Sequence, residues 1–200
     1  MSKPLQEYCQ QVIAEHGRGW KIRQALQFGN TAVKEDADNV WWRRKSTRRA
    51  IFWENAVNKL IELMADDPGC VVIRHHDTVS FVFDDAVLVR LKKADMALRT
   101  SNFPTPQAEL FHDHHADLFG HDLQRVEAVY IPNRFDTGII WSGIVARQKK
   151  VHLWHFEFTE PLVVPVVSIP QPVQPPIASL ARLRNQAKGG KHETKKNGGK

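Results

Sequence analysis

The chain has 200 residues, of which 42% are hydrophobic and 25% are charged, proportions typical of a folded protein with a buried core. Its only cysteines are Cys9 and Cys70, which excludes a disulfide framework or a cysteine-rich zinc site and is typical of a reducing compartment. The first residues contain no apolar signal core, and residues 162–169 are too short, and interrupted by Pro165, to cross a membrane. We therefore expect a cytoplasmic protein with no membrane span.

The net charge of +6 is concentrated in two short segments. Residues 41–50 contain five cationic side chains and no acidic one, and residues 182–200 contain seven cationic side chains and one acidic one. Residues 51–181 carry a net charge of −5, whereas residues 1–40 carry none. The middle of the chain is therefore mildly acidic, and its basic character lies in one short run and one tail.

The first part of the chain has the apolar spacing of helices. Apolar side chains at Leu5, Val12 and Ile13 predict a helix that ends near Gly17, and a second short helix is expected over residues 22–28.

A stronger helical pattern begins at Ser46 or Thr47, either of which is a suitable cap, and ends at the Asp66–Gly69 turn. We interpret residues 1–45 as a helical N-terminal extension that carries the basic run, and residues 46–160 as the core domain.

After this helix the apolar period changes to two, which predicts strands over residues 71–75, 79–83 and 86–92. The links at His76-Asp77 and Asp84-Asp85 are short enough to force neighbouring strands to run antiparallel.

A helix is then predicted from Thr105, which precedes a proline, to about Phe119. Three more strands are expected over residues 126–131, 139–146 and 151–158. In the last of these, one face is shared by Trp154, Phe156 and Phe158.

The predicted fold class is α+β, with an antiparallel sheet built from two three-stranded meanders in the order α-βββ-α-βββ. The prolines that begin at Pro161 cannot lie inside a sheet, and the last residues are rich in lysine and glycine. We expect residues 161–200 to form a disordered tail, which is first proline-rich and then rich in lysine and glycine.

The segment FHDHHADLFGHD carries the side chains that metals prefer. On a helix, His112 and His115 are three positions apart and Asp113 and Asp117 are four apart, so each pair converges, but the four groups do not share one face. The pattern favours the polar face of a helix, and we predict neither a metal nor a cofactor.

A metal-dependent nuclease is a second catalytic hypothesis. Asp84 or Asp85, followed by Arg90-Leu91-Lys92, has the outline of a restriction-type magnesium site. However, Arg90 stands where the site needs a carboxylate, and the two aspartates are also explained by a hairpin turn. We therefore identify no catalytic residues, and the sequence favours a protein that is not an enzyme.

The basic run WWRRKSTRR combines aromatic and cationic side chains, a composition suited to nucleic acid. The candidate residues are Trp41, Trp42, Arg43, Arg44, Lys45, Arg48 and Arg49. The alternative is that the two tryptophans pack on the domain while the cations face water.

A second cationic group lies on and after the third predicted strand. It consists of Arg90, Lys92, Lys93, Arg99 and Asn102. Arg90 and Lys92 are two positions apart and share a strand face, and a helix start lies nearby, so this surface could bind an anion or an acidic partner. The alternative is structural, with Arg90 and Lys92 paired to acidic residues of adjacent strands.

This segment resembles a family of uncharacterised bacterial and prophage proteins, whose pattern is similar to L-R-[LF]-K-x-x-D followed by R-N-Y-P-T. The matching positions are Leu88 or Val89, Arg90, Lys92, Asp95, Arg99, Asn102, Phe103, Pro104 and Thr105. The resemblance covers residues 52–158, and the later segments VEAVYIPNRFDTGI and LWHFEF are also similar. The chain departs from the pattern at Ser101 and in its histidine-rich helix.

Members of this family are encoded in mobile elements, beside helix-turn-helix regulators that carry a metallopeptidase-like domain. The resemblance therefore implies a regulatory or toxin–antitoxin-like module of two genes. We expect a non-catalytic interaction protein that binds a protein partner encoded nearby. The alternative is a nucleic-acid-binding protein that uses the basic run and the tail, and a metal-dependent nuclease is the third hypothesis.

Overall fold

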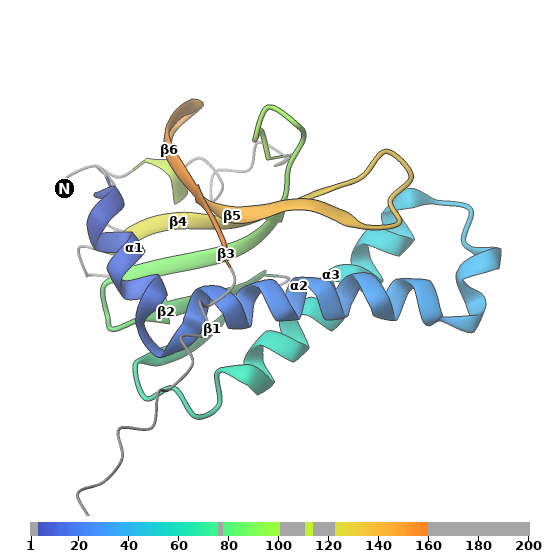
Figure 1. The fold of residues 1–200 in the computed structure, drawn as a ribbon, viewed down its shortest axis with the longest axis horizontal. Helices are drawn as coiled ribbons and strands as arrows, with labels where there is room; N and C mark the ends of the chain where they lie inside the picture. Colours follow the sequence, from blue (N-terminus) through green and yellow to red (C-terminus); the bar gives the residue numbers. More distant parts are fainter. Residues whose placement is uncertain (1–3, 76–77, 101–110, 114–122, 160–200) are drawn as a thin grey trace, which may run out of the picture. The chain divides into compact units, whose positions relative to one another are not determined.

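A computed structural model describes residues 4–75, 78–100, 111–113 and 123–159 (Figure 1). The chain divides into one compact unit, Met1–Pro161, and a second, Leu162–Lys200, so all described residues belong to the first unit. Within these residues, no helix is both long enough and apolar enough to cross a lipid bilayer. The predicted tail, residues 161–200, lies outside the described part of the chain.

Three α-helices precede the sheet. They are α1 (Gln6–Ala14), α2 (Arg18–Glu35) and α3 (Lys45–Leu63), with short 3-10 turns at η1 (Glu15–Gly17) and η2 (Ala37–Trp41). His16 and Gly17 have left-handed backbone conformations, with φ of 50° and 66°, so the chain changes direction where the first helix was predicted to end. The predicted second helix, residues 22–28, was too short, and α3 begins without the predicted side-chain cap from Ser46 or Thr47.

Six strands form one sheet. They are β1 (Cys70–His75), β2 (Thr78–Phe83), β3 (Val87–Lys93), β4 (Gln124–Pro132), β5 (Ile139–Gln148) and β6 (Val151–Glu157). They lie in chain order across the sheet, and every neighbouring pair is antiparallel except β3 and β4, which are parallel. The fold is therefore α+β with a mixed, mostly antiparallel sheet.

The parallel pair corrects the prediction of an antiparallel sheet. Parallel neighbours need a crossover between them, and residues 94–123 supply it. Most of the helix predicted from Thr105 to Phe119 lies outside the described residues.

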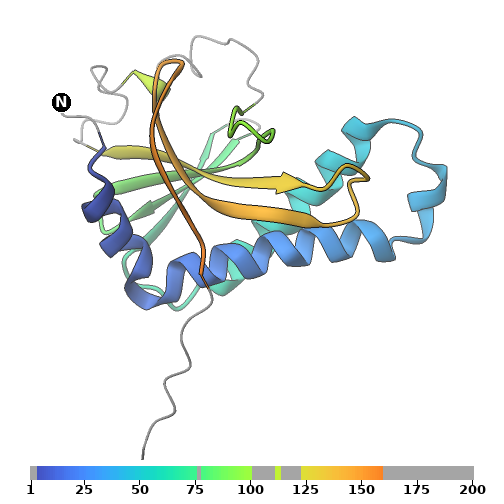
Figure 2. The same ribbon diagram turned by 45° about the horizontal axis from the view of Figure 1, so that its top comes forward.

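The helices cover one face of the sheet, with α2 and α3 side by side (Figures 1 and 2). Gly29 of α2 lies so close to α3 that an added Cβ would be 2.7 Å from the carbonyl oxygen of Phe52, which is why the two helices can touch. One hydrophobic core joins the helices to alternate residues of the strands. It includes Ile22, Leu26 and Leu60 from the helices, and Phe81, Val89 and Ala128 from the strands.

The same core corrects the predicted domain boundary at residue 45. Cys9, Val12 and Ile22 are buried in the cluster that also contains the strand residues, so α1 and α2 are parts of the domain and not an extension of it. The face predicted for β6 is confirmed, since Phe158 is buried in this cluster and both Trp154 and Phe156 pack against it.

A buried arginine joins four segments of this unit. The Arg18 side chain, in the first turn of α2, has no exposed surface, and its Nε donates to Asp67 Oδ2 at 2.7 Å. Its Nη1 donates to Asp84 Oδ2 at 2.5 Å and to the carbonyl oxygen of Val12 at 2.9 Å. The guanidinium also lies 5.0 Å from the centre of the Phe83 ring. One side chain therefore connects α1 and α2 to the α3–β1 turn and to the β2–β3 turn.

Local backbone geometry allows these contacts. Asp84 and Asp85 have φ of 52° and 49°, left-handed conformations within the tight three-residue turn, residues 84–86, that brings Asp84 back towards the helices. Gly69 lies against the same group, because an added Cβ would overlap the Asp84 carboxylate and crowd the Arg18 guanidinium. Hydrogen bonds from Arg18 hold the pKa of Asp67 and of Asp84 below the usual range, although burial opposes this.

We predict that Arg18→Met destabilises the protein by about 3–5 kcal/mol, because it leaves a buried carboxylate without its cation. Urea denaturation followed by circular dichroism measures the change. Lys34→Met, which removes an exposed cation from the same helix, is the control and is expected to change stability by less than about 0.5 kcal/mol. Equal stabilities of the two variants would contradict the assignment.

Candidate functional site

The two predicted cationic groups occupy different environments. Arg90 and Lys92, of the group on β3, belong to a cluster around the buried Glu127, whereas the basic run stands at an exposed end of the α2–α3 pair. Lys93 lies on the other face of β3, beside the basic run.

Arg90 and Lys92 project from β3 on the sheet face opposite the helices, which confirms that they share a face. Arg90 lies beside Glu127 of β4 in the strand register. Arg90 Nε donates to Ser80 Oγ at 2.9 Å, and its guanidinium lies 4.2 Å from the centre of the Phe111 ring. Both cations are half-buried.

Glu127 is the centre of this cluster and is only 1% exposed. Its Oε2 accepts a hydrogen bond from Thr100 Oγ1 at 3.0 Å and lies 3.4 Å from Arg147 Nε. Its Oε1 lies 3.4 Å from His112 Nε2. Thr100 and His112 belong to the connection between β3 and β4, whereas Glu127 belongs to a strand. The Glu127 carboxylate therefore links these two residues of the connection to the sheet.

Burial and charge oppose each other in the pKa values of this cluster. Burial lowers the pKa of Arg90 and of Lys92, and the charge of Glu127 partly offsets this effect. Burial would raise the pKa of Glu127, but a hydrogen bond with His112 and the charges of His112 and Arg147 hold it below the usual range. The cluster is therefore a set of buried charges that stabilise one another, and this favours the structural alternative for Arg90 and Lys92.

The other members of the strand group have separate roles. Arg99 is 75% exposed and contacts Asp95, with Arg99 Nη2 at 2.8 Å from Asp95 Oδ2. Lys93 lies on the opposite face of β3 and forms an ion pair with Asp136 at 3.1 Å. Asn102 lies outside the described residues.

The sequence interpretation missed Glu127 and Arg147. A signal for Glu127 was present, because a single carboxylate within the apolar run VEAVYI requires a cation once the strand is buried. Arg147 lies near the end of its strand, and nothing local in the sequence indicates that it turns towards Glu127.

Two aspartates, one from the metal-site hypothesis and one from the nuclease hypothesis, contact cationic side chains of the domain. Asp84 is bound to Arg18, and Asp113 lies 3.7 Å from Lys149 Nζ. In the part of the chain that the structure describes, no group of three or more His, Cys, Asp or Glu side chains could hold a metal ion. His115 and Asp117 lie outside that part.

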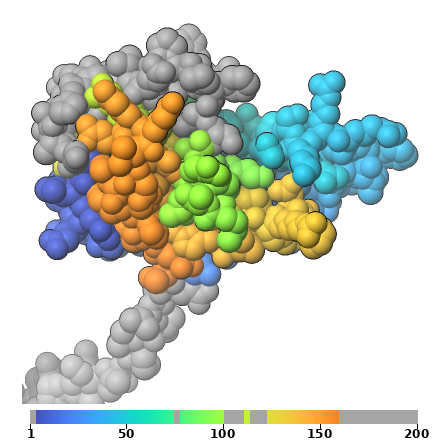
Figure 3. All heavy atoms as spheres, turned by 90° about the horizontal axis from the view of Figure 1, so that it is seen from above, coloured from blue at the N-terminus to red at the C-terminus, as the bar shows by residue number. Residues whose placement is uncertain are grey.

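The basic run forms what we call the basic end, defined as Trp41, Arg43, Arg44, Lys45, Arg48 and Arg49. Its residues lie at the end of η2 and in the first turns of α3, at the far end of the two long helices (Figure 2). Figure 3 shows the same cyan segment projecting from the surface. All of these residues are exposed except Arg48, which is half-buried.

The two tryptophans of the run behave differently. The Trp41 side chain is 74% exposed, whereas Trp42 is half-buried and packs against the core. The alternative in which both tryptophans dock on the domain is therefore correct for Trp42 only. Trp41 presents an aromatic surface to solvent beside the cations.

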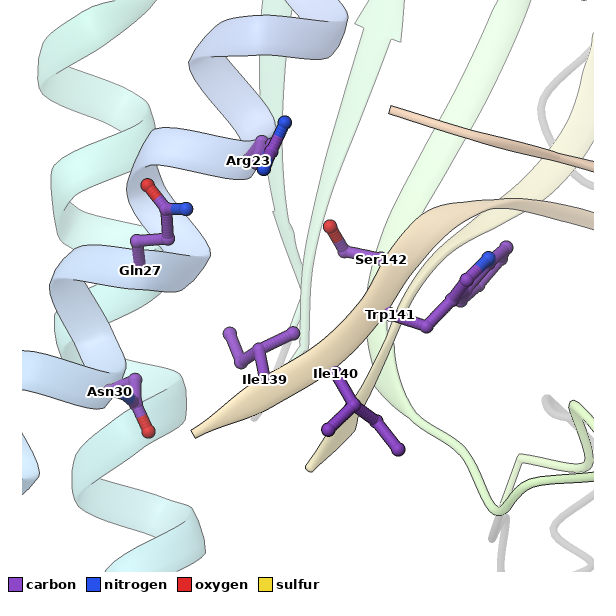
Figure 4. Close-up of a pocket in the computed structure, with 7 residues that line it drawn as sticks. All are labelled: Arg23, Gln27, Asn30, Ile139, Ile140, Trp141 and Ser142. Carbon is purple, nitrogen blue, oxygen red and sulfur yellow. The ribbon is translucent and has the colours of Figure 1, made fainter. Parts of the chain in front are cut away.

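A groove of about 240 Å³ lies between α2 and the start of β5 (Figure 4). Arg23, Gln27 and Asn30 line its helical side, and Ile139 and Ser142 face them from the strand. Ile140 and Trp141 point away from the helix. The groove combines polar and apolar walls next to a strand.

Comparisons with protein-family models, with curated proteins and with solved structures found no match to this chain. The family resemblance described above stays a prediction.

We predict that Glu127→Gln lowers the free energy of unfolding at pH 7 by about 3–5 kcal/mol, because the buried cations lose their carboxylate. The pKa of Glu127 is lowered in the folded state, so its contribution is present above the unfolded-state pKa, about 4.3, and is lost as pH falls through the folded value. The stability difference between wild type and variant should therefore shrink below about pH 4.3.

Urea denaturation over a series of pH values measures this difference. Glu157→Gln, at an exposed position on β6, is the control and should follow the wild-type curve. A Glu127→Gln variant with wild-type stability at pH 7 would show that the carboxylate does not hold the cluster together.

Proposed function

We propose that this protein binds nucleic acid through the basic end. The observation that carries this proposal is the gathering of exposed cations beside an exposed indole, at the far end of the two long helices. Exposed arginine and lysine side chains contact phosphates and release condensed counterions. An exposed tryptophan can stack on a base, and this favours a single strand, because its bases are open to stacking.

The basic end suits a ligand better than the strand cations do, because most of its side chains are exposed. Arg90 and Lys92 lie half-buried next to Glu127 and would lose these contacts on reaching a ligand. Arg43, Arg44 and Lys45 are exposed, and binding a phosphate there breaks no ion pair among the described residues.

The distribution of charge along the chain also favours binding of nucleic acid at the basic end. Residues 51–181 carry a net charge of −5, so the acidic part of the chain repels a polyanion while the basic end attracts it. The basic tail, residues 182–200, adds an attraction that is independent of the fold.

Binding to a protein partner encoded nearby is our second proposal. It rests on the resemblance to proteins encoded beside regulators, and on the groove along β5. Two large apolar side chains of the β4–β5 hairpin, Phe135 and Ile140, are 76% and 53% exposed, as is common for residues that a partner covers. A role in a two-gene module of a mobile element belongs to this second proposal.

The double variant Arg43→Glu/Arg44→Glu tests the first proposal. We predict that it weakens binding of a fluorescein-labelled single-stranded oligonucleotide by at least about tenfold near 0.1 M salt, because two phosphate contacts become repulsive. The slope of log affinity against log salt should fall by about 1.4, since each contact on a single strand contributes about 0.7. Fluorescence anisotropy with the full-length chain measures both quantities.

The control is Lys149→Glu/Lys150→Glu, which changes the net charge equally in the exposed β5–β6 turn. It should keep most of the affinity. Equal losses in the two double variants would show that only the total charge matters and would contradict a site at the basic end.

A further inference from the structure

A small crevice opens where the basic end meets the sheet. It lies between α2, α3, β3 and the β4–β5 loop and has a volume of about 30 Å³, room for a group a few atoms across. Four cations line it, namely Lys45, Arg48, Arg49 and Lys93. The two cationic groups of the sequence therefore meet in this crevice, because Lys93 comes from β3 and the others come from α3.

The charge of the crevice is strongly positive. Among the described residues that line it, Asp136 is the one acidic side chain, and it is paired with Lys93. The start of α3 adds to the positive field, since Arg44 offers no side-chain cap and the first turn contains no acidic residue. The unpaired N–H groups at a helix start favour an anion.

Arg48 supplies an independent sign of a missing ligand. Its Nε is buried and has no hydrogen-bond partner among the residues that the structure describes. Its Nη2 makes one long contact, 3.5 Å from the carbonyl oxygen of Asn39. A buried donor without an acceptor costs free energy, and an anion in the crevice would supply the acceptor.

Two aromatic side chains belong to the lining of the crevice. Phe52 and Tyr130 line it and stack on each other with ring centres 4.3 Å apart. The Tyr130 hydroxyl is protonated at neutral pH, as is usual for tyrosine, and burial raises its pKa further. The crevice therefore combines cationic donors with an aromatic lining.

We propose that this crevice binds one phosphate group of the nucleic acid held by the basic end, with Arg48, Arg49 and Lys93 as its ligands. This inference rests on the proposed function, because the bound phosphate belongs to a strand that also contacts Arg43, Arg44 and Trp41. A phosphate-binding site of this kind fixes the position of the nucleic-acid strand relative to the domain, whereas the exposed cations only attract that strand. Free phosphate has the same chemistry and serves as a probe.

Two variants of the full-length protein test the crevice. Arg48→Gln removes the guanidinium, and Lys93→Met removes the cation from β3 and so tests the site without changing α3. The control is Lys150→Met, which removes one exposed cation far from the crevice.

Two measurements are made on each protein. The first is oligonucleotide affinity as a function of salt, and the second is the rise in Tm on adding inorganic phosphate, compared with chloride at equal ionic strength. We expect phosphate to raise the Tm of the wild type and of Lys150→Met, but not of Arg48→Gln or Lys93→Met. Both crevice variants should bind the oligonucleotide about tenfold more weakly, with a salt slope smaller by about 0.7.

The outcomes separate the two proposals. If the wild type binds the oligonucleotide, phosphate leaves its Tm unchanged and both crevice variants bind normally, the crevice proposal is overturned and the basic end stands. If phosphate stabilises the wild type but no oligonucleotide binds, the proposed function fails and the crevice, as a seat for a strand, fails with it. A loss of affinity in Lys93→Met with an unchanged Tm in buffer supports the crevice and excludes a folding defect.

Discussion

The position of the helices relative to the sheet depends on one buried cation. Arg18 is fully enclosed and is held by Asp67 and Asp84, which belong to two different turns of the chain. A buried guanidinium with both carboxylates in place is satisfied, but removing the guanidinium leaves the buried Asp67 carboxylate without its cation. This requirement fixes the first turn of α2 against the β2–β3 hairpin. Because α2 runs from that point to the basic end, the same contact determines where the exposed cations stand.

Cationic residues have two physical roles in this chain. Around Glu127, Arg90 and Lys92 are half-buried and burial lowers their pKa values, while His112 and Arg147 contact the carboxylate directly. At the basic end all the cations except Arg48 are exposed and can exchange counterions for phosphates. Lys93 marks the division, because it follows Lys92 in sequence but lies on the other face of the strand, beside the crevice. The alternation of side chains along β3 therefore separates structural cations from candidate ligands.

The sequence predicts local elements well and long-range contacts poorly. All six strands were predicted to within two residues at each end, because their apolar period and the Asp84-Asp85 turn are local signals. The length of α2 was missed because Gly29 resembles a helix end, whereas here it allows close contact with α3. The parallel pairing of β3 and β4 depends on a long connection with no pairing signal of its own. The partners of Arg18 are 49 and 66 positions away, so nothing near it indicates that it is buried.

Hydrogen–deuterium exchange of the full-length protein, with and without a single-stranded oligonucleotide, tests the central claim most directly. The account predicts that nucleic acid slows exchange in η2 and in the first turns of α3. It also predicts that β3 exchanges slowly in both states, because its backbone is hydrogen-bonded between β2 and β4 in the sheet. Protection that appears on β3 and on residues 94–100, with η2 unchanged, would place the binding surface on the strand cations and contradict the account.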